Sequence, residues 1–205
     1  MKIFHAVTED QPMIQRHLKP LVEESLEHFP VVAILGPRQV GKSTLAQMLP
    51  SKRWPARYLT LDDMTLLDAA LRDPDGFLEG LDFPVIVDEV QRVPDLLRSI
   101  KRVVDRGRKP GLCLLTGSAN LLTLQSVSET LAGRAVLLDL HPFSWGELQR
   151  QPSPSPSLDA LFASRTAKEF VACLPKSAPV SRQDLTTRIL SGGYPTPALM
   201  TAGRP

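Results

Sequence analysis

The stretch from Val31 to Leu45 constrains the fold of this chain more than any other. It reads VVAILGPRQVGKSTL, an apolar run of strand length followed by a polar loop and the start of a helix. The loop fits the pattern G-x-x-x-x-G-K-[ST] at every fixed position. An apolar strand of this kind is typical of a parallel sheet that is buried on both faces. The stretch therefore predicts an α/β fold built around a phosphate-binding loop, the P-loop.

Each fixed residue of the P-loop has a physical role. Gly36 and Gly41 let the backbone turn sharply, so that successive N–H groups point at phosphate oxygens. Lys42 brings a positive charge to the β- and γ-phosphates, and Ser43 offers a hydroxyl to Mg²⁺ beside the N-terminus of the next helix. We expect a nucleoside triphosphate site whose binding residues are Gly36, Pro37, Arg38, Gln39, Val40, Gly41, Lys42, Ser43 and Thr44.

Strands and helices are expected to alternate along most of the chain. Apolar runs predict five strands, at 31–35, 58–61, 84–87, 112–116 and 135–140. Apolar residues at helical spacing predict helices at 12–28 with a kink or break at Pro20, and then at 42–49, 66–71, 77–81, 95–106 and 121–132. This alternation predicts a parallel sheet with helices on both faces.

The composition changes at 151–157, which reads QPSPSPS. Alternating Pro and Ser form neither a helix nor a strand ladder, so this segment is expected to be an extended linker or exposed loop. We expect a P-loop domain over 1–150, followed over 151–205 by the linker and short helices at 158–170 and 182–190. After these helices, SGGYP marks a sharp break.

The bulk composition is that of an ordinary globular protein. Of the 205 residues, 42% are hydrophobic and 22% are charged, and the net charge of +2 does not by itself imply a polyanionic partner. Cys113 and Cys173 are the only cysteines, and the first lies inside an apolar run, which favours reduced thiols. No apolar run approaches the ~20 residues of a membrane span. We therefore expect no membrane partner and a cytoplasmic location.

Two carboxylates follow the predicted strand at 84–87. Asp88 and Glu89 would lie at the carboxyl end of that strand, where ligands bind in open parallel sheets. Asp88 is expected to hold Mg²⁺ through water, and Glu89 to act as the general base for the attacking water. The alternative is a solvated turn after a strand.

Small polar residues follow the strand at 112–116, in the run TGSAN. Thr116 and Ser118, with Asn120 behind them, are candidates to bond the γ-phosphate or the attacking water. The alternative is a turn that caps the next helix. Arg134, beside Gly133, is a candidate to stabilise charge during phosphoryl transfer, within this chain or from a neighbouring subunit. A solvated arginine is the alternative.

A basic cluster lies on the helix at 95–106 and the loop after it. Nucleic acid phosphates or an acidic partner would fit it, but it has no interleaved aromatic residues, and a solvated face is the favoured interpretation. Its members are Arg98, Lys101, Arg102, Arg106, Arg108 and Lys109.

Several ordered segments together resemble a family of prokaryotic AAA-type ATP-binding proteins that join an N-terminal ATPase domain to a C-terminal domain of unknown function. The segments are GPRQVGKST, YLTLDD, DPDGFL, VIVDEVQ, LLTGSANLL, LAGRA, HPFSWGE and GGYP. The resemblance covers roughly residues 13–150, and GGYP more thinly. It implies a five-stranded AAA-like sheet in which the fourth strand lies between the P-loop strand and the Asp-Glu strand.

This resemblance implies ATP as the nucleotide, with Mg²⁺, and it strengthens the expectation for Arg134. It leaves a homo-oligomer and a protein or nucleic-acid partner open. Family members continue beyond GGYP into a second domain, so we expect this chain to hold mainly the ATPase part of a longer architecture. We expect ATP hydrolysis that drives an unidentified conformational step; the alternative is a non-catalytic ATP-binding switch or an ATPase with little turnover.

Overall fold

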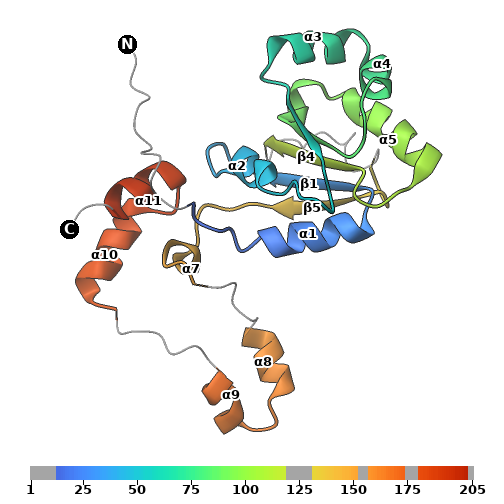
Figure 1. Ribbon diagram of the computed structural model, residues 1–205. Coiled ribbons are helices and arrows are strands. Elements are labelled where there is room, and N and C mark those ends of the chain that lie inside the picture. The colour runs from blue at the N-terminus through green and yellow to red at the C-terminus, as the bar shows by residue number, and fades with distance from the viewer. Residues whose placement is uncertain (1–12, 119–130, 152–156, 174–179, 203–205) are drawn as a thin grey trace, which may run out of the picture.

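A parallel five-stranded sheet forms the centre of the molecule (Figure 1). The structure, a computed structural model, describes residues 13–118, 131–151, 157–173 and 180–202. The strands are β1 (Val31–Gly36), β2 (Arg57–Thr60), β3 (Val85–Asp88), β4 (Cys113–Ser118) and β5 (Ala135–Asp139), in the spatial order β2-β3-β4-β1-β5. The predicted α/β sheet is therefore confirmed, including the position of β4 between the P-loop strand and the Asp-Glu strand.

Helices cover both faces of this sheet. One face is covered by α3 (Met64–Arg72), α4 (Pro74–Glu79) and α5 (Leu96–Gly107), and the other by α1 (Lys19–His28) and α2 (Lys42–Gln47). A 3₁₀ turn, η1 (Val90–Arg92), follows β3. The chain beyond β5 forms α7 (Trp145–Leu148), α8 (Ser157–Ala163), α9 (Ala167–Cys173), α10 (Arg182–Ser191) and α11 (Pro195–Ala202).

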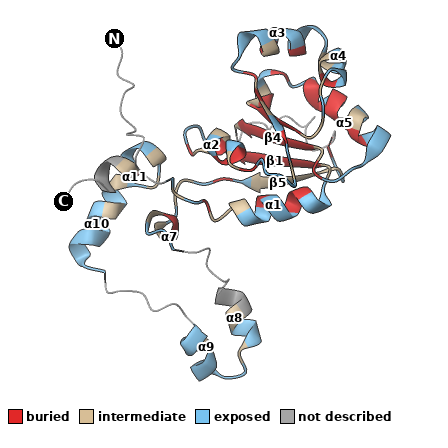
Figure 2. Ribbon diagram, viewed as in Figure 1, coloured by how far each residue is buried: buried red, intermediate tan, exposed pale blue. Residues whose placement is uncertain are grey.

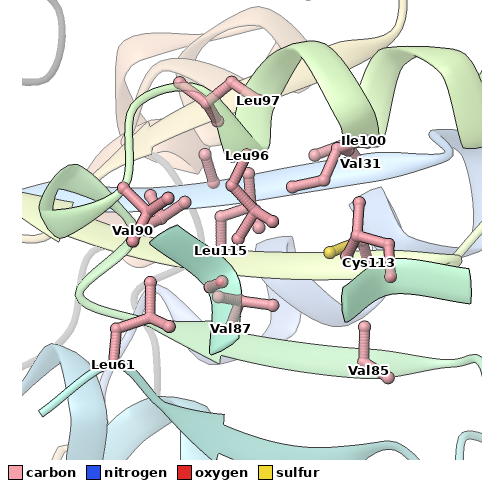
Figure 3. Close-up of a cluster of buried hydrophobic side chains, with 14 of the residues drawn as sticks. Val31, Leu61, Val85, Val87, Val90, Leu96, Leu97, Ile100, Cys113 and Leu115 are labelled. Atoms are coloured by element: carbon pink, nitrogen blue, oxygen red, sulfur yellow. The ribbon is translucent and has the colours of Figure 1, made fainter. Parts of the chain in front are cut away.

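The alternation of side chains along the strands gives the sheet two hydrophobic cores. On β1, Val31, Ala33 and Leu35 pack against the α3–α5 face, whereas Val32 and Ile34 pack against α1 and α2. All six residues of β1 are buried, which explains the unbroken apolar run in the sequence. Figure 3 shows the first core, where Val90, Leu96, Leu97 and Ile100 meet the sheet. The buried residues concentrate in and around the sheet (Figure 2).

Some helix boundaries differ from the predictions. The helix predicted at 12–28 begins only at Lys19, because Pro20 occupies its first turn, where the missing N–H has no intrahelical partner to lose. The helix predicted at 158–170 is divided into α8 and α9, since Thr166 Oγ1 accepts a hydrogen bond from Glu169 N–H and caps a new helix. No helix was predicted at α11, and most of the helix predicted at 121–132 lies outside the described residues.

The helices after α7 expose several large apolar side chains. Phe162, Ile189 and Leu190 are examples, and neither α9 nor α10 contributes a buried residue (Figure 2). Even so, none of the helices in the described part of the chain has the length and apolarity to span a bilayer.

Candidate functional site

The P-loop leaves β1 through two glycines that no other residue would replace without strain. A Cβ on Gly36 would lie 2.3 Å from the carbonyl oxygen of Leu140, because the end of β5 runs directly beside the loop. Gly41 has a φ of +94°, in the left-handed region that favours glycine. Between them, Pro37, Arg38 and Gln39 are exposed, whereas Val40 is buried in the core under the loop. The loop is thus anchored at Val40 and open above it.

Lys42 lies almost fully buried at the mouth of this loop. Its Nζ donates to the carbonyl oxygens of Gly36 at 3.1 Å and Pro37 at 2.8 Å. Burial lowers the pKa of Lys42 from its ordinary value; the carboxylates of Glu89 and Asp88 oppose this shift, and Arg38 adds to it. The ammonium is therefore held by loop carbonyls at the place where the sequence predicts phosphates.

Asp88 ends β3 as a buried carboxylate surrounded by hydroxyl groups. Its Oδ1 accepts from Ser43 Oγ at 2.9 Å and from Thr116 Oγ1, and its Oδ2 accepts from Tyr58 at 2.8 Å and Thr60 at 3.4 Å. Burial, together with the hydrogen bond to Asp88, raises the pKa of Tyr58 to about 12. Four hydroxyls from β2, β4 and the start of α2 thus fix one carboxylate. Tyr58 and Thr60 were not among the predicted site residues.

Glu89 takes a backbone conformation that is uncommon for a residue with a side chain. Its φ of 59° and ψ of 41° lie in the left-handed region, and its N–H donates to Thr116 Oγ1 at 3.1 Å. Non-glycine residues in this region are frequent at functional sites. The conformation turns the chain immediately after β3 and brings Glu89 into the wall of the P-loop pocket.

The predicted residues of β4 occupy two different environments. Thr116 is fully buried, and its hydroxyl donates to the Asp88 carboxylate and accepts from the backbone N–H of Glu89. Ser118 is half-buried, and its N–H donates to Gln91 Oε1 at 3.2 Å. Asn120 lies outside the described residues. Contacts of Thr116 and Ser118 with the γ-phosphate or the attacking water stay predictions.

The pocket that these elements surround has a volume of about 540 Å³. It gathers the P-loop, the Asp-Glu turn, the loop after β2 and the start of α11. The residues that line it are Arg38, Gln39, Gly41, Lys42, Ser43, Thr44, Asp62, Glu89, Pro195 and Thr196. Pro195 is the last residue of the GGYP segment and Thr196 follows it; no role in the site was predicted for either residue.

A buried arginine bonds the backbone of the P-loop on its core side, and it was not among the predicted site residues. Arg16 donates through Nη1 to the carbonyl oxygen of Val40 at 2.7 Å, through Nη2 to that of His141 at 2.5 Å, and through Nε to Glu147 at 3.0 Å. Its guanidinium also lies 4.6 Å from the centre of the Phe143 ring. Arg16 therefore joins the P-loop to the HPFSWGE segment.

Glu147 is the acidic partner in this network and part of a helix cap. Burial works to raise the pKa of Glu147, but the N–H groups of Ser144 and His17 and the Arg16 guanidinium bind the carboxylate and hold the pKa below its ordinary value. With Ser144 it forms a capping box at the start of α7. The S-x-x-E spacing at 144–147 is typical of a capping box and could have indicated this helix start from the sequence.

The structure does not bring Arg134 to the pocket. It precedes β5, whose first residue pairs with Val31 at the amino end of β1, whereas the P-loop follows the carboxyl end. Its guanidinium binds Asp105 at the end of α5, with an Nε–Oδ1 distance of 2.6 Å. The expected contact with phosphate from within the same chain is therefore wrong, because the length of the sheet separates the two. A contact in a neighbouring subunit stays a prediction.

Three of the six members of the basic cluster form ion pairs with acidic residues. Arg98 pairs with Asp95 on its own turn. Arg102 and Arg106 pair with Asp75 and Glu79 of α4. Arg102 holds the pKa of Asp75 below its ordinary value through hydrogen bonds. These pairs favour the solvated interpretation of the cluster over a nucleic-acid surface.

Comparisons with known proteins agree with this geometry. Over 120 residues the chain is 38% identical to two uncharacterized proteins, Rv2008c of Mycobacterium tuberculosis and Mb2031c of Mycobacterium bovis, and the match covers 58% of this chain and 26% of each relative. The structure of AMPPCP-bound DnaA from Aquifex aeolicus has a TM-score of 0.50 and 14% identity, covering 89% of this chain and 57% of that one, which concerns the fold alone. Residues 28–149 match the sequence profile of a family described as AAA domain. Because that match spans more than half of the chain, the chain belongs to this family and carries an AAA-type P-loop ATPase domain.

Proposed function

We propose that this chain binds ATP and hydrolyses it with Mg²⁺. The observation that carries the proposal is the placement of Asp88 and Glu89 at the end of β3, with Glu89 in the wall of the P-loop pocket. A P-loop alone requires only nucleotide binding. A second carboxylate at the pocket wall supports hydrolysis, because a water molecule there would have a base beside it.

The side chains around Asp88 fit a magnesium ion. Ser43 Oγ and Asp88 Oδ1 lie 2.9 Å apart, and hydroxyl and carboxylate oxygens are the ligands that this ion prefers. When bound, Mg²⁺ would neutralise phosphate charge and polarise the phosphoryl group. Ser43 would bind the ion directly, and Asp88 through water. Lys42 would exchange the carbonyls of Gly36 and Pro37 for phosphate oxygens.

Glu89 would act as the general base in the hydrolysis step. Its carboxylate would accept a proton from a water molecule as the water oxygen forms a bond to the γ-phosphorus. The bond between that phosphorus and the bridging oxygen breaks, and ADP leaves with the electron pair. Lys42 would stabilise the charge that develops on the phosphate oxygens.

The preference for ATP rests on the family. The similar DnaA structure is described as bound to AMPPCP, an ATP analogue, which supports an adenine nucleotide for this fold. What the ATP cycle drives is a separate matter, and the chain spans only about a quarter of the length of its curated relatives. We propose a conformational change that is passed to a partner or to a further part of such a longer protein.

The test is phosphate release and nucleotide affinity in Glu89→Gln. We expect turnover to fall by at least a hundredfold while the dissociation constant for Mg-ATP stays within about threefold, since the amide keeps the shape of the carboxylate but cannot take a proton. Gln183→Ala, an exposed change on α10, is the matched control. Unchanged turnover in Glu89→Gln would remove Glu89 as the base. ATP binding without turnover in the unmodified chain would favour the switch instead of the hydrolase.

Arg134 could contribute to hydrolysis only in an oligomer. Its guanidinium would have to leave Asp105 and meet the pocket of a neighbouring copy. Turnover per chain that rises with protein concentration, and loses that rise in Arg134→Ala, would support such a contact. A concentration-independent rate that is unaffected by the substitution would refute it.

A further inference from the structure

Gln91 lies two residues after Glu89, in the 3₁₀ turn that follows β3, and its side-chain amide bridges two parts of the site. Gln91 Nε2 donates to Glu89 Oε2, and Gln91 Oε1 accepts from the Ser118 N–H at 3.2 Å. One amide therefore connects the proposed base on the Asp-Glu turn to the end of β4. None of the predicted roles used this residue.

The orientation of this amide follows from the chemistry of its two neighbours. A backbone N–H can only donate, so the oxygen of the amide must face Ser118. The nitrogen then faces Glu89, whose ionised carboxylate can only accept. A reversed amide would leave a donor against a donor and an acceptor against an acceptor, so the bridge has a single arrangement.

The turn that carries Gln91 is fixed by the core and by its neighbours. Val90 and Val93 are buried against the sheet, where Figure 3 shows Val90 beside Leu96 and Leu115. Arg92 Nη1 donates to the carbonyl oxygen of Leu61 at 2.9 Å and binds Asp62. The left-handed backbone of Glu89 completes the turn. The position of the amide is therefore set by well-packed residues on both sides of it.

The bridge occupies only one oxygen of the Glu89 carboxylate. Within the part of the chain that the structure describes, Oε2 is bound by Gln91, and no donor bonds Oε1. Glu89 also lines the pocket beside Lys42 and Ser43. The arrangement holds the carboxylate by one oxygen and leaves the other for a water molecule.

We propose that Gln91 is a positioning residue for hydrolysis, which holds the carboxylate of Glu89 in register with the end of β4. This inference rests on the proposed function of the site. Gln91 acts through Glu89 and does not contact the nucleotide. A flexible glutamate would sample many rotamers, and an error of about 1 Å in the position of a base can cost a hundredfold in rate.

Two variants separate the halves of the bridge. Gln91→Met keeps the length of the side chain but removes the donor and the acceptor. Gln91→Glu keeps an acceptor for the Ser118 N–H but replaces the donor with a charge that repels Glu89. We expect both to lower kcat by about tenfold to a hundredfold, with the dissociation constant for Mg-ATP within threefold and the melting temperature within a few degrees of the unmodified chain. Gln183→Glu controls for the added charge on an exposed glutamine.

The decisive measurement combines these variants with Glu89→Gln. If Gln91 acts through the Glu89 carboxylate, Gln91→Met should change the residual turnover of Glu89→Gln by less than twofold, because the base is already absent. A merely structural role would lower the rate by the same factor in both backgrounds. Equal factors, or a rise in kcat on removal of Gln91, would overturn the proposal.

A spectroscopic measurement keeps the inference testable if the unmodified chain releases no phosphate. That result would refute the hydrolysis proposal, but the bridge would remain to be examined. In ¹⁵N-labelled protein, the side-chain amide signal of Gln91, assigned by its loss in Gln91→Glu, should move when Glu89 is replaced by alanine and should exchange slowly with solvent. A signal that stays at the position of an exposed glutamine, unaffected by Glu89→Ala, would show that no bridge forms.

Discussion

Arg16 and Glu147 form a buried ion pair between residues that are 131 positions apart in the chain. The Nε–Oε1 distance is 3.0 Å, and the two side chains are only 7% and 5% exposed. Because the same guanidinium donates to the carbonyl of Val40, the pair also fixes the backbone of the P-loop. One side chain thus connects the buried ion pair to the backbone of the P-loop.

Removing Arg16 should destabilise the protein strongly. Arg16→Ala leaves Glu147 charged and buried without its partner, which typically costs about 3–5 kcal/mol. Urea unfolding should show this loss, and ATP affinity should fall as the carbonyl of Val40 loses its donor. The control is Lys19→Ala, which breaks an exposed pair with Glu23 and should change the free energy of unfolding by less than about 1 kcal/mol. Equal effects of the two substitutions would refute the buried role.

The stabilising contribution of Glu147 should be lost in acid. Its pKa is lower in the folded chain than the ordinary value of about 4.3, so the folded state favours the ionised form. The stabilisation is complete above pH 4.3 and is lost as the pH falls through the lowered pKa. The loss of unfolding free energy between pH 7 and pH 3 should therefore be smaller in Glu147→Gln than in the unmodified chain. An identical loss in both would mean that other carboxylates, such as Asp75, account for the acid sensitivity.

As the pH rises, nucleotide affinity should begin to fall at a lower pH than it would if Lys42 had the ordinary pKa of a lysine. Burial lowers the pKa of Lys42, and only the protonated ammonium attracts phosphate. As the pH rises through this lowered pKa, the ammonium is lost and the dissociation constant for ATP should increase. Lys42→Arg should bind more weakly at pH 7 but lose this pH dependence, because arginine stays charged. Titration calorimetry between pH 7 and pH 9.5 tests this, and parallel pH profiles for the two chains would contradict it.

The hydroxyls around Asp88 should set the requirement for magnesium. Tyr58→Phe removes one of the donors to Oδ2 and leaves Thr60 at the longer distance of 3.4 Å. With a less constrained carboxylate, the Mg²⁺ concentration for half-maximal turnover should rise several-fold, while ATP affinity without the ion stays the same. A magnesium titration of phosphate release measures this. An unchanged titration would show that the donors from Ser43 and Thr116 alone fix Asp88.

The fold and the centre of the site were predictable because their signals are local in the sequence. A strand buried on both faces must be apolar throughout, as β1 is, and a P-loop must have glycine at positions such as 36, where a neighbouring backbone excludes a Cβ. Asp88 and Glu89 follow an apolar strand directly, so their place at its carboxyl end could be inferred. Each of these inferences uses fewer than ten consecutive residues.

The parts that were missed depend on contacts between distant segments. The residues around Arg16 do not indicate that its partner is Glu147. The residues around Tyr58 do not indicate that it bonds Asp88 on the adjacent strand. Arg134 shows the opposite error, since a glycine and an arginine in a loop resemble a phosphate contact whichever end of the sheet they occupy. The predicted parallel strand at 135–140 begins directly after Arg134, which already implies the amino end of the sheet, and the pairing of Ala135 with Val31 confirms that position.

Gly193 should decide whether the start of α11 belongs to the nucleotide pocket. Its carbonyl oxygen accepts from the Phe143 N–H at 2.7 Å, and a Cβ at this position would lie 2.5 Å from the Phe143 carbonyl oxygen. Gly193→Ala must therefore push the turn away from Phe143. Since Pro195 and Thr196 line the pocket, ATP affinity should fall severalfold.

The same substitution should be visible through Trp145, whose ring lies 4.5 Å from the guanidinium carbon of Arg188 on α10. In a Trp54→Phe background, Trp145 is the remaining tryptophan, and its fluorescence should change when α10 and α11 shift. Gly107→Ala is the matched control, because a Cβ there meets no atom within 4 Å. If Gly193→Ala alters neither the fluorescence nor the ATP affinity, α11 is not part of the pocket wall, and the site ends at the P-loop and the turn after β3.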